Sequence, residues 1–246
     1  MPVSVYITCT EALKDEALYR RALEMVSPAR KEKVLRCSCA SVRAQSLAAE
    51  LLLRRALSDA GIDPGDLHFE YGPHGKPYLP EFKNIHFNLS HSGSFAMAAV
   101  SENEIGCDIE KIRDTDLKDT DLKDTDLKIA RRFFTRGEYE KITALPDAAE
   151  RNILFFRYWT LKESFLKVTG LGMHLPLNAF EINIQTNVLI SSRQDSDLIS
   201  VRQNVDHRQY HFAEIDLIPG YRCAVCAAGE AVELRVRQID LPELLA

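Results

Sequence analysis

The order in which predicted helices and strands follow one another repeats along the chain, and this repetition restricts the fold more than any other feature. In each half, apolar residues at helical spacing are followed by short apolar or alternating segments. The helices are predicted at 11–26, 41–60, 127–144 and 150–169. The strands are predicted at 3–8, 67–71, 85–89, 95–101, 105–112, 179–190, 198–204, 209–217 and 221–228. The strand–helix–strand alternation of a parallel sheet does not occur.

This order predicts an α+β fold made of two similar halves, each with a small, largely antiparallel sheet packed by helices. The halves are expected to meet near residue 104, which gives an N-terminal half over 1–104 and a C-terminal half over 105–246. The length of 246 residues allows one large domain or two of ordinary size. A functional site between two such halves is an arrangement that this order allows.

Composition and charge narrow the class of protein. Hydrophobic residues make up 46% of the chain, which suits a soluble globular core. No apolar run reaches the roughly 18 residues of a membrane helix, and the first residues lack the layout of a signal peptide. Residues 1–60 carry ten basic and seven acidic side chains, whereas residues 101–126 carry four and ten. We therefore expect a cytoplasmic protein with neither a membrane nor a nucleic acid as partner, and the basic segment could attract an anionic ligand.

Six cysteines at irregular spacings are interpreted as reduced, structural thiols. The pair Cys223 and Cys226 has the spacing of half a zinc site, but residues three apart on a strand point to opposite faces. Cys37 and Cys39 offer no better arrangement. We therefore do not predict a zinc site.

One short repeat stands out. The pentad Asp-Thr-Asp-Leu-Lys occurs three times without a break over residues 114–128. A period of five residues fits neither a helical stripe nor the alternation of a strand. The calcium loop of an EF-hand is excluded because its glycine and distal glutamate are missing. The repeat is interpreted as an acidic, solvated linker lengthened by duplication.

Three carboxylates and one ammonium group are predicted to converge. Asp108 and Glu110 are two positions apart on a predicted strand, and Glu163 and Lys167 are one turn apart on a predicted helix, so each pair shares a face. Carboxylate oxygens are ligands for a hard cation such as Mg²⁺, which is commonly shared with substrate phosphates. A nearby lysine suits the phosphates themselves.

Two further segments carry polar residues that suit an anion. Asn88–Gly93 is predicted as a polar turn between apolar strands, in which His91 is flanked by Ser90, Ser92 and Gly93. A lone histidine is more often a structural residue. Lys76 lies in the Gly/Pro-rich loop 72–77 and is predicted to be on an exposed turn.

Taken together, these segments resemble the 4′-phosphopantetheinyl transferases of the surfactin-synthetase (Sfp) type, and the resemblance covers nearly the whole chain. The matching segments are Gly75–Pro77, Phe87–Gly93, Ile105–Lys111, Arg132–Phe134, Trp159–Lys167, Gly170–Pro176 and Pro219–Cys226. The resemblance implies a pseudo-twofold monomer that binds coenzyme A between its halves. It also implies transfer of the phosphopantetheine arm to a serine of an apo carrier protein, with release of adenosine 3′,5′-bisphosphate.

The resemblance also implies roles for individual residues. Asp108, Glu110 and Glu163 would hold Mg²⁺ on the pyrophosphate, and Glu163 or a water on the metal would take the serine proton. Lys167 would neutralise the phosphate, with Lys162 assisting. His91 and Ser90 would bind the 3′-phosphate, and Lys76 would lie beside the nucleotide phosphates. Because the nucleophile belongs to the carrier, no catalytic serine or cysteine is needed on this chain.

The chain departs from the family pattern in two places. Where the family carries an arginine shortly before a glycine–acid pair, this chain has Gln45, with Ala49 at the glycine position. We expect Arg43, or a residue of Arg30–Lys33 with Lys31 as the candidate, to supply that charge. Two of the three pentads are extra relative to the family length, in the region where the family is expected to meet its carrier, commonly an acidic domain.

Two other classes of function compete with this interpretation. Another Mg²⁺-dependent enzyme that cleaves pyrophosphate would use the same carboxylates but leaves the segments at 72–77 and 88–93 unexplained. A module that only binds coenzyme A or a carrier would not need three metal ligands. The carrier itself stays open between a peptidyl carrier of nonribosomal (antibiotic) synthesis, a fatty-acid acyl carrier, or both.

Overall fold

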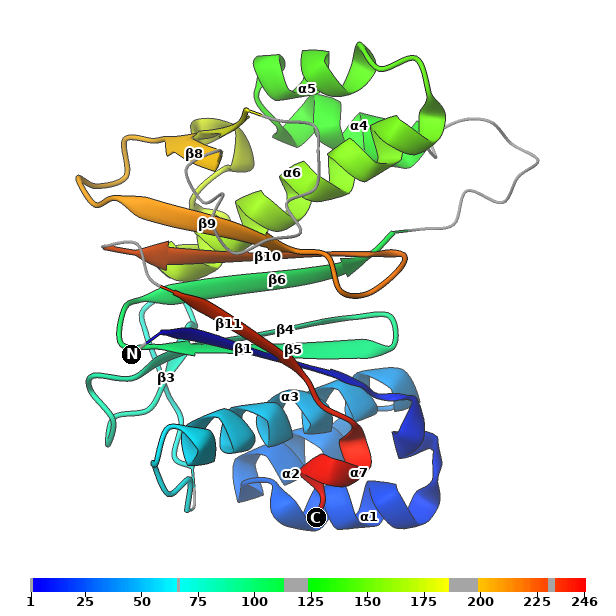
Figure 1. Ribbon diagram of the computed structural model, residues 1–246, viewed down its shortest axis with the longest axis vertical. Helices are drawn as coiled ribbons and strands as arrows, with labels where there is room; N and C mark the ends of the chain where they lie inside the picture. Colours follow the sequence, from blue (N-terminus) through cyan, green and yellow to red (C-terminus); the bar gives the residue numbers. More distant parts are fainter. Residues whose placement is uncertain (1, 66, 113–123, 186–198, 230–232) are drawn as a thin grey trace.

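The computed structural model describes residues 2–65, 67–112, 124–185, 199–229 and 233–246. Two sheets lie face to face in the middle of the molecule, and a group of helices covers the outer face of each sheet (Figure 1). This arrangement confirms the predicted α+β class with two halves and small, largely antiparallel sheets.

The first half contains a four-stranded sheet with the order β11-β1-β5-β4. Its strands are β1 (Val3–Cys9), β4 (His86–Ser92), β5 (Phe95–Ser101) and β11 (Leu234–Gln238). The helices on its outer face are α1 (Glu16–Met25), α2 (Pro28–Arg36) and α3 (Ala40–Asp59), after a 3-10 turn at Glu11–Lys14. A hairpin of β2 (Glu70–Tyr71) and β3 (Pro77–Tyr78) follows α3. Helix α2 is not among the predicted helices, although Ser27 caps it and Pro28 is its first residue.

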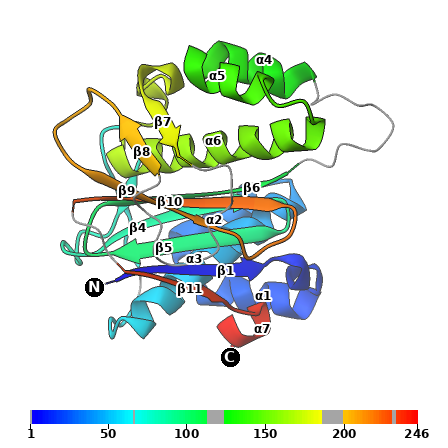
Figure 2. The same cartoon turned by 45° about the horizontal axis from the view of Figure 1, so that its top comes forward.

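The second half contains a three-stranded sheet with the order β6-β10-β9, and a separate small hairpin. The sheet strands are β6 (Ile105–Lys111), β9 (Tyr210–Ile215) and β10 (Tyr221–Ala228), and the hairpin strands are β7 (Glu181–Ile184) and β8 (Ile199–Arg202). The helices are α4 (Asp124–Phe133), α5 (Arg136–Thr143) and α6 (Ala148–Thr169), with 3-10 turns at Gly172–His174 and Leu177–Ala179. Helix α6 lies along the outer face of this sheet (Figure 2).

Alternation along the strands builds the core between the two sheets. Odd-numbered residues of β1 and β6, such as Val5 and Cys107, are buried between the sheets, whereas Tyr6 packs toward the helices of the first half. On β10, Cys223 belongs to this central core and Cys226 to the core beneath α6. The two thiols therefore lie on opposite faces, as expected from their spacing, and all six cysteines are free.

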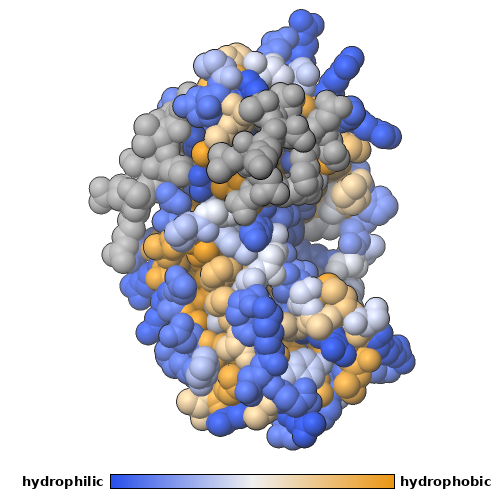
Figure 3. All heavy atoms as spheres, turned by 90° about the vertical axis from the view of Figure 1, so that its right-hand side faces the viewer, coloured by the Kyte–Doolittle hydropathy of each residue, from blue (hydrophilic) through white to orange (hydrophobic). Residues whose placement is uncertain are grey.

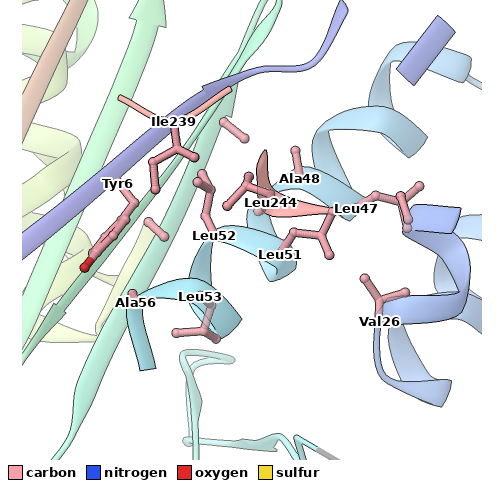
Figure 4. Packing of buried hydrophobic residues seen from close by; sticks show 14 of the residues in the cluster. Tyr6, Val26, Leu47, Ala48, Leu51, Leu52, Leu53, Ala56, Ile239 and Leu244 are labelled. Carbon is pink, nitrogen blue, oxygen red and sulfur yellow. The ribbon is translucent and has the colours of Figure 1, made fainter. Parts of the chain in front are cut away.

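The end of the chain returns to the first half. Strand β11 pairs in parallel with β1, and α7 (Leu241–Leu244) packs near α3. Figure 4 shows Leu244 beside Leu47 and Leu51 of α3, and Ile239 nearer to Tyr6 and Leu52. The prediction that 105–246 forms the second half is therefore wrong for its last part. The cause is the alternating segment at 234–238, which is not among the predicted strands and forms β11.

The third copy of the pentad is not a linker. Residues 124–128 form the first turns of α4, where Asp126 is 2% exposed and Leu127 packs against the core of the second half. The first two copies, residues 114–123, lie outside the described residues. The predicted helix 127–144 is in fact two helices, because Thr135 and Glu138 form a capping box that starts α5.

Hydrophilic side chains are interspersed with small groups of hydrophobic ones on the face shown in Figure 3. Among the described residues, no helix is both long and apolar enough to cross a membrane.

Candidate active site

Strand β6 and helix α6 approach each other closely at Gly106. A Cβ atom at this position would lie 2.1 Å from the carbonyl oxygen of Ser164 and 2.4 Å from the amide nitrogen of Val168. Only glycine therefore fits at this crossing. The contact brings Asp108, two positions further along β6, next to the last turns of α6, which carry Glu163 and Lys167.

Strands β4 and β6 are the edges at which the two sheets meet, and polar side chains join them. Asn88 Oδ1 accepts a hydrogen bond from the Cys107 amide at 2.9 Å, Ser90 Oγ from the Ile109 amide at 3.3 Å, and Ser92 Oγ from the Lys111 amide at 3.1 Å. Each partner lies nineteen positions further along the chain. The two strands therefore run parallel, with side-chain oxygens in place of carbonyls.

The prediction that Asn88–Gly93 is a turn is therefore wrong, because residues up to Ser92 belong to β4. The polar residues reflect the junction between the sheets. The turn itself is at Gly93, whose φ is +55° and where a Cβ would lie 2.3 Å from the Tyr221 hydroxyl.

Asp108, which is buried, and Lys167, which is half-buried, form an ion pair at the centre of the site. Lys167 Nζ lies 2.6 Å from Asp108 Oδ1 and 3.0 Å from both Ser90 Oγ and the Cys107 carbonyl oxygen. Ser90 in turn donates to Asp108 Oδ1 at 2.9 Å. The second oxygen of Asp108, Oδ2, is buried and has no hydrogen-bond partner among the described residues. A buried carboxylate oxygen without a partner is costly, so this atom is suited to a ligand.

A pocket of about 310 Å³ opens between the halves at this pair. It is lined by Leu89, Ser90, His91, Asp108, Glu110, Trp159, Glu163 and Lys167. The structure thus brings together the three predicted metal ligands, the predicted catalytic lysine and His91. Among the described residues, however, no three acidic, histidine or cysteine side chains already converge as a finished metal site.

The pKa values show an excess of negative charge in this pocket. Burial, with the nearby Asp108 carboxylate, raises the pKa of Glu163 to about 7 and shifts the pKa of Glu110 upward. Burial by itself lowers the pKa of Lys167, but the interactions with Asp108 and the other neighbouring groups together outweigh burial, and the net direction is upward. Three carboxylates thus face one ammonium group. Together with the unpartnered Asp108 Oδ2, this donor set fits a hard divalent cation.

A group of basic residues lies beside the pocket. Burial lowers the pKa of His91, and the positive charges of Lys167, Lys33 and Arg30 lower it further. Arg30 is held by Glu50 at 3.0 Å and by Ser46 at 3.1 Å. Glu50 is fully buried and also accepts from the Ser27 amide at the start of α2. These contacts fix the Arg30 guanidinium at the start of α2, close enough for its charge to act on His91.

The sequence predicts Arg43, or a residue of Arg30–Lys33 with Lys31 as the candidate, as the source of the missing charge. Lys31 is exposed on α2. The Arg43 guanidinium lies 5.7 Å from the centre of the Tyr19 ring. Gln45, at the position where the family carries arginine, donates to the Gly93 carbonyl at 2.8 Å and supports the turn after β4. The signals that identify Arg30 are the helix start at Ser27–Pro28 and its buried partner Glu50.

Two predicted phosphate ligands have other partners in the structure. Lys162 is fully buried, lies 2.8 Å from Glu138 Oε1 and donates to the carbonyls of Leu177 and Phe180. Its assignment to the phosphates is therefore wrong, because its ammonium joins α6 to α5 and to the segment before β7. Lys76 donates to the carbonyls of Ile105 and Val168, both at 3.1 Å, and so links the hairpin loop to the second half.

Ser90 also differs from its predicted role. Its hydroxyl donates to Asp108 and accepts from Lys167 and from the Ile109 amide, which uses its one donor and both acceptor positions. The hydroxyl is thus committed to the Asp108 network. Among the residues predicted for the 3′-phosphate, the geometry leaves His91, together with the basic group on α2.

Comparison with known proteins gives matches over almost the whole chain. A family model described as "4'-phosphopantetheinyl transferase superfamily" matches residues 104–226, and one described as "4'-phosphopantetheinyl transferase, N-terminal" matches residues 14–103. The chain is 31% identical to 4′-phosphopantetheinyl transferase Sfp of Bacillus subtilis (strain 168), over 92% of each chain. It is also 31% identical to 4′-phosphopantetheinyl transferase gsp of Aneurinibacillus migulanus, over 81% of this chain and 76% of that protein. A more distant relative, at 25% identity over 85% of this chain and 72% of its own, is L-aminoadipate-semialdehyde dehydrogenase-phosphopantetheinyl transferase of Rattus norvegicus.

Proposed function

The chain belongs to the 4′-phosphopantetheinyl transferase superfamily, and on this basis we propose that it moves the 4′-phosphopantetheine arm of coenzyme A to a serine of an apo carrier protein. The reaction would depend on Mg²⁺ and release adenosine 3′,5′-bisphosphate. The observation that supports this most strongly is the pocket between the halves, where Asp108, Glu110 and Glu163 lie beside Lys167. We further propose that the protein acts as a monomer, because one chain supplies both sides of this pocket.

Asp108, Glu110 and Glu163 are the residues that would hold Mg²⁺, and the cation would supply positive charge to the pyrophosphate as it is cleaved. His91, with Arg30 and Lys33 close by, would bind the nucleotide phosphates on the β4 side. Lys167 would face the phosphate that is transferred, because its ammonium is held at the floor of the pocket by Asp108 and Ser90. This arrangement would orient coenzyme A with its pyrophosphate between the two groups.

The transfer itself needs one base. The carrier serine oxygen would form a bond to the phosphorus that carries pantetheine, and the phosphoanhydride bond to the adenosine bisphosphate would break. Glu163 would accept the serine proton, because its carboxylate lines the pocket beside Lys167, where the reacting phosphate would lie. Positioning and charge neutralisation carry most of the catalysis in reactions of this type.

The proposal is tested by incubating the protein with coenzyme A, Mg²⁺ and a small panel of apo carriers that includes a peptidyl and an acyl carrier. We expect at least one carrier to gain the mass of one phosphopantetheine. Cleavage of coenzyme A without carrier modification would instead indicate a pyrophosphate-cleaving enzyme. Binding of coenzyme A with neither outcome would indicate a binding module.

A further inference from the structure

Ser92 makes two contacts that differ in kind. Its hydroxyl accepts a hydrogen bond from the Lys111 amide at 3.1 Å, just as Asn88 and Ser90 accept from the backbone amides of β6. It also donates to Glu110 Oε2 at 2.7 Å. Ser92 belongs to the first half and Glu110 to the second. The same hydroxyl therefore helps to align β4 with β6 and also holds the Glu110 carboxylate.

Glu110 needs such support more than Asp108 does. It lies near the end of β6, where the strand passes from buried to exposed residues. Asp108 is shorter, buried and held by Lys167 and Ser90. A longer glutamate side chain near a strand end loses more rotamer freedom when it binds a cation, so a fixed hydrogen bond reduces the cost.

We propose that Ser92 is a positioning residue that holds Glu110 in the orientation required for the divalent cation. This inference rests on the proposed function, since it assumes that Glu110 is a metal ligand. Ser92 has the donor for this task because the Lys111 amide occupies only an acceptor position of its hydroxyl. The register of β4 against β6 places that donor opposite Glu110.

A purely structural role for Ser92 predicts a different result from a positioning role. If Ser92 served only to satisfy the Lys111 amide, its removal would lower stability slightly and leave cation binding unchanged. Ser92→Ala removes both contacts, whereas Ser92→Thr keeps the hydroxyl on a side chain that suits a strand. Ser94→Ala is a matched control, because Ser94 lies two positions further along and its hydroxyl contacts Glu11 instead of a site carboxylate.

The experiment titrates Mn²⁺ into protein saturated with coenzyme A and follows the electron paramagnetic resonance of the free metal, with coenzyme A alone as the blank. We expect the Mn²⁺ dissociation constant of Ser92→Ala to rise roughly tenfold, as is typical for the loss of a side chain that orients a ligand. Ser92→Thr and Ser94→Ala should stay near wild type. The affinity for coenzyme A measured in EDTA should be the same in all four proteins.

Wild-type Mn²⁺ affinity in Ser92→Ala, or an equal loss in Ser92→Thr, would overturn the positioning role. Absence of Mn²⁺ binding to the wild-type protein beyond the blank would contradict the proposed metal site itself. The two failures are therefore distinguishable.

Discussion

Asp108 shows how the site balances its charges at the scale of single residues. One of its carboxylate oxygens satisfies Lys167 and Ser90, and the other is buried without a partner among the described residues. Lys167 cannot neutralise Glu110 and Glu163 as well, which is why burial and mutual repulsion raise the pKa of both glutamates. The protein alone thus leaves a negative charge that a divalent cation would remove.

This imbalance predicts that Glu163 destabilises the metal-free protein at neutral and alkaline pH. Its pKa rises from 4.5 in the unfolded chain to about 7, so the folded state holds the proton more tightly. Protonation of Glu163 therefore favours the folded state; this contribution is complete below pH 4.5 and is lost as the pH rises through about 7, where the ionised carboxylate destabilises the fold. In urea unfolding with EDTA, Glu163→Gln should be more stable than wild type at about pH 8, by on the order of 2–3 kcal/mol. The difference should shrink strongly at about pH 5.

Glu24→Gln, on the exposed side of α1, is the control and should change stability little at either pH. A Glu163→Gln protein that is no more stable than wild type at pH 8 would show that the carboxylate is not strained by its surroundings.

His91 gives a second prediction at this scale. If its imidazole and the neighbouring basic group receive the 3′-phosphate, His91→Ala should weaken the binding of coenzyme A about tenfold or more. The binding of dephospho-coenzyme A should hardly change, because that ligand lacks the phosphate; a charge-assisted hydrogen bond is worth roughly 1.5–3 kcal/mol. Isothermal titration with both ligands measures the difference.

His68→Ala, on the exposed segment before β2, is a suitable control. Equal weakening for the two ligands in His91→Ala would assign His91 a structural role.

At the scale of elements, the sequence predicted the helices and strands around the site well, and its errors have physical causes. Asp108, Glu110, Glu163 and Lys167 converge as predicted, because strand and helix periodicity determines which residues share a face. The segment 88–92 was predicted as a turn because its polar residues face another strand and not solvent. Their role depends on β6, which pairs with β4 through side chains, and such pairing leaves no apolar pattern to recognise.

Contacts between distant segments also explain why the predicted role of Lys162 is wrong and that of Lys167 fits the pocket. Lys162 and Lys167 have the same chemistry in the sequence, yet one is buried against Glu138 and the other faces the pocket. The partner of Lys162 comes from α5, and no local pattern indicates that contact.

The close packing of β6 against α6 at Gly106 allows a prediction about both stability and the site. A methyl group there would overlap the backbone of α6, so Gly106→Ala should push β6 and α6 apart. We expect a loss of stability of about 1–3 kcal/mol, typical of overpacking, and a weaker site because Asp108 moves relative to Glu163. Thermal unfolding and coenzyme A binding measure the two effects.

Gly137→Ala is the matched control, since its new methyl would meet only the end of the flexible Glu181 side chain and an alanine favours the helix α5. If the two variants were equally stable, the close approach of β6 and α6 would not be a constraint.

At the scale of the whole molecule, the chain crosses between its halves more than once. The C-terminal strand and helix complete the first half, and Lys76 ties the hairpin loop to the start of β6 and the end of α6. The site lies where these connections meet. A two-part reading of the sequence captures the doubled architecture but misses the return of the tail, because pairing between distant strands is not visible in local patterns.

The three pentads allow a prediction about the molecule and its partner. Because the copies are identical, deletion of 119–128 leaves one pentad directly before Ile129, and that pentad can form the start of α4. Fold, coenzyme A affinity and maximal rate should therefore be preserved. The deletion removes four aspartates and two lysines, so KM for an acidic carrier should fall, most clearly at low salt, because the Debye length is only about 10 Å at 0.1 M.

Carrier loading by wild type and the deletion variant at two salt concentrations measures this effect, with a weakly charged carrier as the control. A higher KM in the deletion variant would show that the extra copies assist docking.

The most direct test of the account asks whether the pocket between β4, β6 and α6 performs the transfer. The measurement is the intact mass of an apo carrier after incubation with coenzyme A and either wild-type protein or Glu163→Gln, each with Mg²⁺ or with EDTA. We predict that wild type adds one phosphopantetheine only with Mg²⁺, and that Glu163→Gln, although folded and able to bind coenzyme A, is at least about 100-fold slower. Near wild-type loading by Glu163→Gln, or full loading in EDTA, would contradict the account.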